Sequence, residues 1–269
     1  MSPSVSSSPR LGRSQGAVLR LSCLAVGAVL AVVPVASAGG GARSSSAGPS
    51  VTSMIVGTGG AILSRAQTVT ASATALRMGA KRCAVAAGTP LAVLAAVRRR
   101  GGPGFALRDY GRCGSSPVNS GQLFVYSLGG ERNRGQSGWE YKVGHVAGST
   151  GAGDPSGPRG DGRRIRPGTH VLWFWCNASA GGCQRTLDLA PSALSVNRGG
   201  SVNVTVTAYD NEGRGTPAVG AIATLGSDFA STGPGGEATL IAPPTPGRYS
   251  LNASRPGLVP SFPETVVVR

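Results

Sequence analysis

Hydrophobic and polar residues alternate strictly in several short segments of the chain, which is the pattern of a half-buried β-strand. The clearest case is SVNVTVTAY, in which Val202, Val204 and Val206 should face a core while the Asn and Thr residues between them face water. From residue 186 to the end, segments of this kind alternate with turns rich in Gly, Pro and Asn. Short strands with a turn signal every roughly 8 to 12 residues are typical of two packed antiparallel sheets. We therefore expect an antiparallel β-sandwich over residues 186–269.

The chain before residue 186 also contains segments with strand patterns. Strands are expected in VTSMIV, QTVTASATALRM, FALRD, QLFVYSL, GWEYKV and THVLWFWC. In THVLWFWC, Val171, Trp173 and Trp175 point to one side and Leu172 and Phe174 to the other. Because both of its faces are apolar, this segment should be a central strand of its sheet.

One helix is expected, beginning at Pro90. Thr89 is a good N-cap residue, Pro is favoured at the first helical position, and LAVLAAV carries apolar residues at helical spacing on one face. Gly101 and Gly102 should end the helix, after three arginines in its last turn. Residues 51–185 thus predict an α+β first half, and residues 186–269 an all-β second half.

The start of the chain has the pattern of a secretory signal peptide over residues 1–38. Three arginines without an acid precede an uncharged apolar stretch, and Ala36-Ser37-Ala38 fits a cleavage site. Residues 39–50 are rich in Gly and Ser and predict a flexible leader. We therefore expect an exported protein, secreted or at the cell surface, with no transmembrane segment after cleavage.

Positive charge is concentrated in the first half. Residues 39–185 contain 18 Lys and Arg against 5 Asp and Glu, a balance of +13, whereas residues 186–269 contain 5 against 6, a balance of −1. Many of the arginines fall in residues 148–168, whose Gly, Pro, Asp and Arg content predicts a long exposed loop. A basic face favours anionic partners such as envelope polymers. A composition rich in Arg, Ala and Gly would also produce the same excess, with the charges merely solvated.

Four cysteines follow the expected signal peptide. An exported chain with an even number of cysteines favours disulfides, and no histidine or Cys-x-x-Cys motif accompanies them to suggest a metal or redox site. Three pairings are possible. We favour Cys83 with Cys113 and Cys176 with Cys183, because each of these bridges joins adjacent elements.

No catalytic or metal-binding motif is present in the sequence. The segment after residue 38 contains two histidines, no H-E-x-x-H and no G-x-S-x-G, so we expect no enzymatic activity and no cofactor. A weaker alternative is an enzyme that uses Asp109 or His145. Asp109 is more readily explained as a turn or cap residue, and His145 as a solvated side chain in a turn.

Four aromatic residues on the strongest strands are the candidate ligand-binding residues: Trp139, Tyr141, Trp173 and Trp175. Aromatic residues on such strands usually belong to the core. If some of these rings are exposed, they would form a ligand groove where they meet the loop at residues 148–168.

The motifs of both halves resemble known families. CAVAAGTPLAVLAAV, FALRDYGRC, QLFVYSL, GWEYKVG and GTHVLWFWC resemble secreted bacterial domains related to the C-terminal domain of transcobalamin, although Gly144-His145 replaces the usual Asn-Gly. This resemblance implies a β-grasp-like sheet crossed by one helix. TVTAYDNEGRGTPAVGAIATLG and GPGGEATLIAPPTPGRYSLNASRPG resemble the Ig-like domains of bacterial surface proteins.

The resulting expectation is a non-catalytic binding protein of the cell surface or exterior. Its basic first half would bind an unknown ligand, such as an anionic envelope polymer, and its Ig-like second half would act as a spacer or docking module. No nucleic acid partner is expected. One alternative is capture of a small, corrinoid-like cofactor, because the related transcobalamin domain helps to enclose cobalamin. Another is a purely structural role in the envelope.

Overall fold

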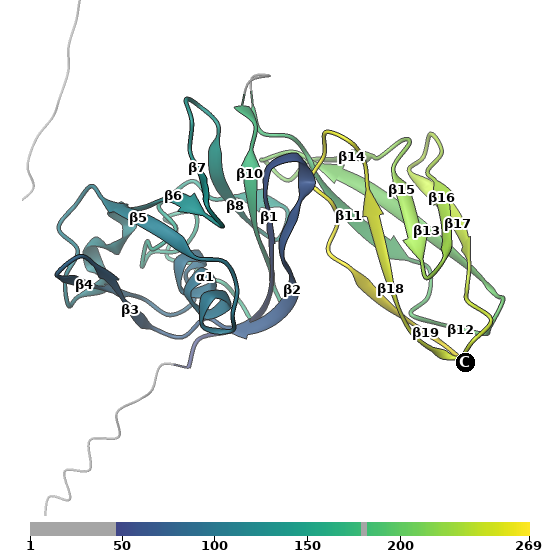
Figure 1. Cartoon of the computed structure of the whole chain (residues 1–269), viewed down its shortest axis with the longest axis horizontal. Coiled ribbons are helices and arrows are strands. Elements are labelled where there is room, and N and C mark those ends of the chain that lie inside the picture. The colour runs from purple at the N-terminus through teal and green to yellow at the C-terminus, as the bar shows by residue number, and fades with distance from the viewer. Residues whose placement is uncertain (1–46, 179–181) are drawn as a thin grey trace, which may run out of the picture. The chain divides into compact units, whose positions relative to one another are not determined.

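The computed structural model describes residues 47–178 and 182–269 (Figure 1). The expected signal peptide and residues 39–46 of the expected leader lie outside these ranges. The first strand begins at Ser50, one residue before the expected start of ordered structure. The preceding residue is also anchored, since the carbonyl of Pro49 accepts a 2.9 Å hydrogen bond from the amide of Ala71.

Ten strands, one α-helix and two short 3-10 helices form the first half of the described chain. In order they are β1 (Ser50–Val56), η1 (Thr58–Gly60), β2 (Ile62–Thr70), β3 (Thr74–Met78), β4 (Lys81–Val85), α1 (Pro90–Arg99), β5 (Phe105–Asp109), η2 (Pro117–Gln122), β6 (Leu123–Leu128), β7 (Glu131–Arg132), β8 (Gly138–Val143), β9 (Val146–Ala147) and β10 (His170–Cys176).

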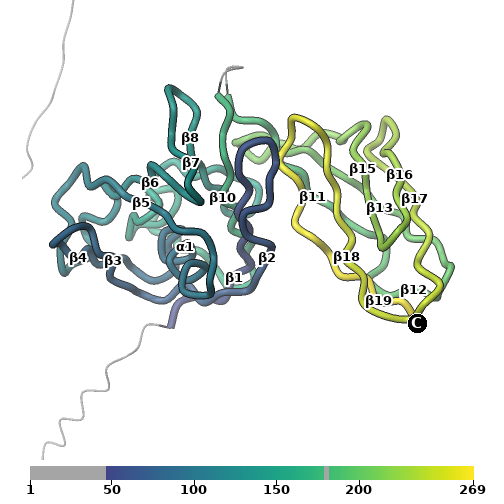
Figure 2. Tube along the Cα trace, viewed as in Figure 1, coloured from purple at the N-terminus to yellow at the C-terminus, as the bar shows by residue number. Residues whose placement is uncertain are grey.

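The main sheet of the first half has the strand order β2-β1-β10-β8-β9. β10 lies between β1, to which it is parallel, and β8, to which it is antiparallel, and Figure 2 shows this adjacency of distant parts of the chain. This arrangement confirms the expected central strand. Two smaller sheets, β3-β4 and β5-β6-β7, complete the first half.

Helix α1 begins where the sequence predicts. The Thr89 hydroxyl accepts a 3.3 Å hydrogen bond from the amide of Ala92, and Pro90 occupies the first turn. The sequence predicts that one apolar face of this helix is buried. In the structure the burial is more extensive, and every residue from Pro90 to Val97 is buried. The neighbouring loop explains this difference, since Ala152 beyond β9 accepts a hydrogen bond from the amide of Leu91.

Nine strands form the second half of the described chain. They are β11 (Thr186–Pro191), β12 (Ser195–Val196), β13 (Ser201–Tyr209), β14 (Gly215–Pro217), β15 (Ile222–Leu225), β16 (Asp228–Ser231), β17 (Glu237–Ile241), β18 (Gly247–Ser254) and β19 (Glu264–Val268). One sheet contains β11-β13-β14 with β17 on β13, and the other has the order β12-β19-β18-β15-β16.

A single hydrophobic core lies between these two sheets. Val202, Val204 and Val206 of β13 are at most 2% exposed and share the core with Leu225 and Leu251 of the second sheet. The alternation in SVNVTVTAY therefore predicts the correct inward residues. The short strands β14 and β16 were not expected, because three or four residues are too few to establish a period of two.

A smaller hydrophobic cluster joins the two halves. Alternate residues of β10 point in opposite directions, so that Trp173 belongs to the core of the first half while Leu172 and Phe174 point to the other face of the sheet. On that face they pack with Val259, which lies between β18 and β19. The main sheet of the first half is thus buried on both faces.

Candidate functional site

Four arginines gather on one segment of the first half, residues 158–169, which we call the arginine loop. A hollow of about 300 Å³ is lined by Arg159, Arg163, Arg164 and Arg166 together with residues of β8 and β9. All four side chains belong to exposed residues. Asp161 is the one carboxylate among the residues that line this hollow.

The arginine loop is held in place by residues that the sequence predicts to be exposed. Ile165 is only 5% exposed and packs in the core of the first half, while its amide donates a 3.1 Å hydrogen bond to the carbonyl of Gly88. Ala152, in the preceding segment, is also buried. The segment 148–168 is thus the irregular loop that the sequence predicts, with no helix or strand, but it is exposed only in part.

Tyr141 fixes the segment that leads into the arginine loop. Its hydroxyl donates a 2.8 Å hydrogen bond to the carbonyl of Thr150, whose own hydroxyl donates to the carbonyl of Gly157 at 2.8 Å. The amide of Ser149 reaches the carbonyl of Pro158 at 3.0 Å. The backbone that carries the arginines is thus tied to a buried side chain of β8.

Two of the four guanidinium groups make polar contacts with the loop or with the segment just before it. Arg164 donates to the carbonyl of Pro155 at 3.1 Å, and Arg163 lies 4.0 Å from the carboxylate of Asp161. In the described part of the chain, the side chains of Arg159 and Arg166 have neither a hydrogen bond nor an ion pair. A guanidinium presents a planar set of donors that matches phosphate and carboxylate groups, so this arrangement suits an anionic ligand.

The four candidate aromatic residues are buried and do not gather in one exposed groove, although Trp175 is among the residues that line a hollow of about 490 Å³ beside Gln184 and Leu258. Trp139, Tyr141, Trp173 and Trp175 are all less than 9% exposed. β8 and β10 are paired so that Trp173 lies beside Tyr141 and Trp175 beside Trp139, and the rings contact each other with centroids 5.4 and 5.8 Å apart. All four belong to the core of the first half, as the alternative interpretation predicts. Burial raises the pKa of Tyr141 to about 12.

Both expected disulfides are present in the structure. Cys83 of β4 is bonded to Cys113 after β5, with Cα atoms 5.0 Å apart, and Cys176 is bonded to Cys183, with Cα atoms 4.8 Å apart. Asp109, four residues before Cys113, also has the turn role that the sequence predicts. The carboxylate of Asp109 accepts hydrogen bonds from the amides of Gly111 and Cys113, at 3.0 and 3.2 Å.

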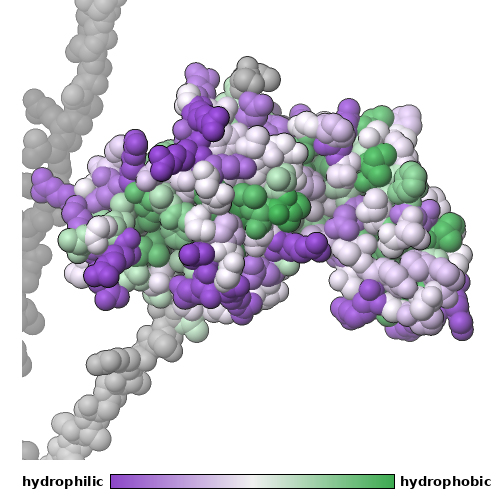
Figure 3. Space-filling model, in the orientation of Figure 1, coloured by the Kyte–Doolittle hydropathy of each residue, from purple (hydrophilic) through white to green (hydrophobic). Residues whose placement is uncertain are grey.

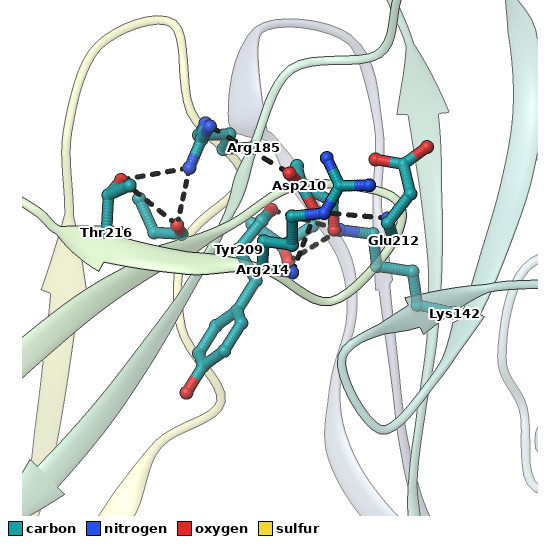
Figure 4. Close-up of polar contacts among 9 residues, drawn as sticks. Lys142, Arg185, Tyr209, Asp210, Glu212, Arg214 and Thr216 are labelled. Carbon is teal, nitrogen blue, oxygen red and sulfur yellow. Dashed lines mark hydrogen bonds and ion pairs between the residues drawn. The ribbon is translucent and has the colours of Figure 1, made fainter.

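A buried lysine connects the two halves, and this site was not expected from the sequence. Lys142 of β8 is 0% exposed, and its ammonium group reaches the second half (Figure 4). It donates to the carbonyls of Asp210 at 2.7 Å and Tyr209 at 3.1 Å and to the hydroxyl of Thr186 at 3.1 Å. We call Lys142 and these three acceptors the lysine latch. It saturates the three donors of an ammonium group.

Burial and neighbouring charges have opposite effects on the pKa of Lys142 in the lysine latch. Burial lowers the pKa of Lys142 to about 8 from its ordinary value of 10.5, and the carboxylates of Asp210 and Glu212 offset part of this effect. The pKa of Asp210 is itself lowered, chiefly because its carboxylate accepts a hydrogen bond from the amide of Arg214. Arg185, which directly precedes β11, lies 4.0 Å from the carboxylate of Asp210 (Figure 4).

Both histidines of the chain lie at this junction. His145, in the turn after β8, stacks on Tyr209 with ring centroids 3.8 Å apart, and its Nε2 lies 3.8 Å from the carboxylate of Asp188. His170 stacks on Phe262 at 4.3 Å. Each pair joins one ring from the first half to one from the second. His145 is thus exposed, as the sequence predicts, and one face of its ring is also packed against Tyr209.

The described residues include no group of three or more His, Cys, Asp or Glu that could hold a metal ion, and no helix among them is long and apolar enough to cross a membrane. The sequence matches no protein-family model, and no curated protein is significantly similar to it.

Proposed function

We propose that the protein is a secreted or cell-surface binding protein whose arginine loop holds an anionic envelope polymer. The observation that carries this proposal is the hollow lined by four arginines, in a half of the chain whose charge balance is +13. A repeating polyanion can contact several guanidinium groups at once. Simultaneous contacts of this kind raise the overall affinity even when each one is weak.

The anchoring of the loop supports this proposal. A flexible arginine tail would lose conformational freedom on binding, whereas Ile165 and the Thr150 hydrogen bonds already hold this backbone in one arrangement. In the same proposal, the first half is a β-grasp-like domain and the second half an Ig-like domain that acts as a spacer. The lysine latch would then hold the spacer against the binding half.

The proposal is tested by retention of the full chain on immobilised poly(glycerol phosphate), with uncharged dextran as the control matrix. Retention is expected at low salt and should fall as salt is raised, because exposed charges are screened over about 8 Å at physiological ionic strength. The variant Arg159→Glu/Arg166→Glu should be retained roughly tenfold less. It changes side chains that have no intramolecular partner in the described part of the chain.

A matched control reverses two exposed arginines of the second half, Arg198 and Arg255, to Glu. It produces the same change in net charge away from the arginine loop. Equal loss of retention in the two double variants would show that only net charge matters, and absence of retention at low salt would contradict the proposal altogether. Circular dichroism of each variant establishes that the fold is unchanged.

A further inference from the structure

A second hollow of the first half lies between the edges of two strands. It has a volume of about 670 Å³ and is lined by three consecutive residues of β3, from Leu76 to Met78, and by three of β5, from Phe105 to Leu107. Consecutive residues of a strand point to opposite faces of its sheet. A hollow that meets all three in a row is therefore bounded by the edges of the strands. We call it the β3–β5 groove.

Both edges are open. β3 pairs only with β4, and β5 pairs only with β6. No backbone hydrogen bond joins β3 to β5 within the described ranges. In a strand with a single neighbour, about half of the amide and carbonyl groups point away from that neighbour and are available to another strand. Each edge is five residues long, and an extended segment of that length spans about 17 Å.

The walls of the groove are apolar. Leu76, Met78, Phe105 and Leu107 are partly exposed while packing against the core of the first half. Figure 3 shows hydrophobic side chains at the surface beside β5, with strongly hydrophilic ones next to them. The bond between Cys83 of β4, which pairs with β3, and Cys113, four residues beyond the end of β5, connects the segments next to the two walls.

The rim of the groove is cationic. Arg77, Lys81 and Arg98 line it, and its one carboxylate, Asp109, is already engaged by Lys81 at 3.6 Å and by two backbone amides. Arg98 comes from the last turn of α1 and donates to the carbonyl of Gly102 at 3.0 Å, which holds its guanidinium beside the start of β5. The side chain of Arg77 has no polar partner in the described part of the chain.

We propose that the β3–β5 groove binds an extended, acidic segment of a partner protein by strand addition. The backbone of that segment would pair with an open edge, its apolar side chains would rest on the groove walls, and its carboxylates would face Arg77 and Arg98. Strand addition of this type gets affinity from the main chain and specificity from alternate side chains. The site is separate from the arginine loop, so this inference does not depend on the proposed polymer.

A competing explanation for the same residues is protection. Exposed strand edges often carry Lys or Arg because charge discourages pairing between copies of a protein. In that case the rim would repel other strands and an acidic peptide would find no preferred site. The two explanations predict different behaviour for an acidic peptide and for a charge reversal at Arg77.

The experiment measures binding of a fluorescein-labelled peptide, Glu-Val-Glu-Val-Glu-Val, to the full chain by fluorescence anisotropy. One control peptide replaces each Glu with Lys, and another keeps all side chains but carries N-methyl groups on alternate amides, which blocks strand pairing. The protein variants are Arg77→Glu in the groove and, as the matched control, Arg134→Glu at an exposed position outside it. Analytical ultracentrifugation of each variant reports self-association.

Saturable binding of the acidic peptide is expected, weakened roughly tenfold by Arg77→Glu and unchanged by Arg134→Glu. The N-methylated and lysine peptides should not bind. Equal binding of the N-methylated peptide would show charge attraction without strand pairing and overturn the proposal. So would equal effects of the two variants, no peptide binding, or self-association of Arg77→Glu without any change in peptide binding. Arg77→Glu should still be retained on poly(glycerol phosphate), because the arginine loop is unchanged in this variant. A loss of peptide binding with retention intact therefore concerns the β3–β5 groove alone.

Discussion

The lysine latch makes the stability of the protein depend on pH in a direction opposite to that of a lysine in an ordinary ion pair, whose pKa is raised by its partner. The pKa of Lys142 is lowered to about 8 in the folded protein from an ordinary value of 10.5. Between these two values the unfolded chain binds more protons than the folded one, so the free energy of unfolding rises with pH. This contribution is complete above the unfolded pKa and is lost as pH falls through the folded pKa.

The size of this effect follows from the difference between the two pKa values. At about 1.4 kcal/mol per pKa unit, the change from 10.5 to about 8 corresponds to about 3.5 kcal/mol, of which about 3 kcal/mol falls below pH 10.5, where half of the unfolded lysine is still protonated. The reference is Lys142→Met, which keeps the length of the side chain and cannot titrate. We expect the free energy of unfolding of the natural protein, minus that of this variant, to rise by about 3 kcal/mol from pH 7 to pH 10.5. Groups that titrate equally in both proteins cancel.

Urea denaturation at intervals of half a pH unit measures this difference. A direct check is possible because the chain contains two lysines, Lys81 and Lys142. Protein labelled with ¹³C at the lysine ε-carbon should give two signals, assigned with Lys81→Arg, and the Lys142 signal should titrate with a midpoint near pH 8. A stability difference that is flat or falls between pH 7 and pH 10.5 would refute the reasoning, as would a Lys142 midpoint at or above 10.5.

Two further changes test the local structure of the first half. Thr89→Ala removes the N-cap of α1 and should lower the free energy of unfolding by about 1 kcal/mol in urea denaturation, whereas Thr89→Ser should retain most of it. Cys83→Ser/Cys113→Ser opens a loop whose ends are 30 residues apart and should cost about 2 to 4 kcal/mol, seen as a lower midpoint in thermal unfolding. An unchanged midpoint would show that the bridge adds nothing to stability, and equal losses in the Ala and Ser variants would count against the cap.

Local rules explain which features could be predicted from the sequence. The start of α1 depends on Thr89 and Pro90, the inward residues of β13 depend on alternation, and the central position of β10 depends on two apolar faces. The disulfide pairing follows from the same elements, because each bridge joins neighbours. Apart from the bridge between Cys83 and Cys113, whose cysteines are 30 positions apart, these features depend on residues that are close together in the sequence.

Features that depend on distant segments could not be predicted in the same way. In GWEYKV the position of Lys142 alternates with inward-facing aromatic residues, and a polar residue there indicates either water or another part of the protein. Only the arrangement of the second half decides this, by placing the carbonyls of Tyr209 and Asp210 opposite the ammonium group. The burial of Ile165 could not be predicted for a similar reason. A single apolar residue among glycines and arginines forms no periodic pattern that would indicate that it is buried.

The arginines of the first half are grouped in two hollows, and this grouping argues against an origin of the positive charge in composition alone. Composition alone would scatter these side chains over the surface, each with its own hydration. Instead, four line the hollow of the arginine loop and two line the β3–β5 groove, where each hollow contains a single carboxylate. Keeping like charges together costs free energy in the unliganded protein, because they repel each other. An anion that enters either hollow removes this repulsion as well as forming its own contacts. For this reason, charge reversal within a hollow should have a larger effect on binding than the same reversal elsewhere on the first half.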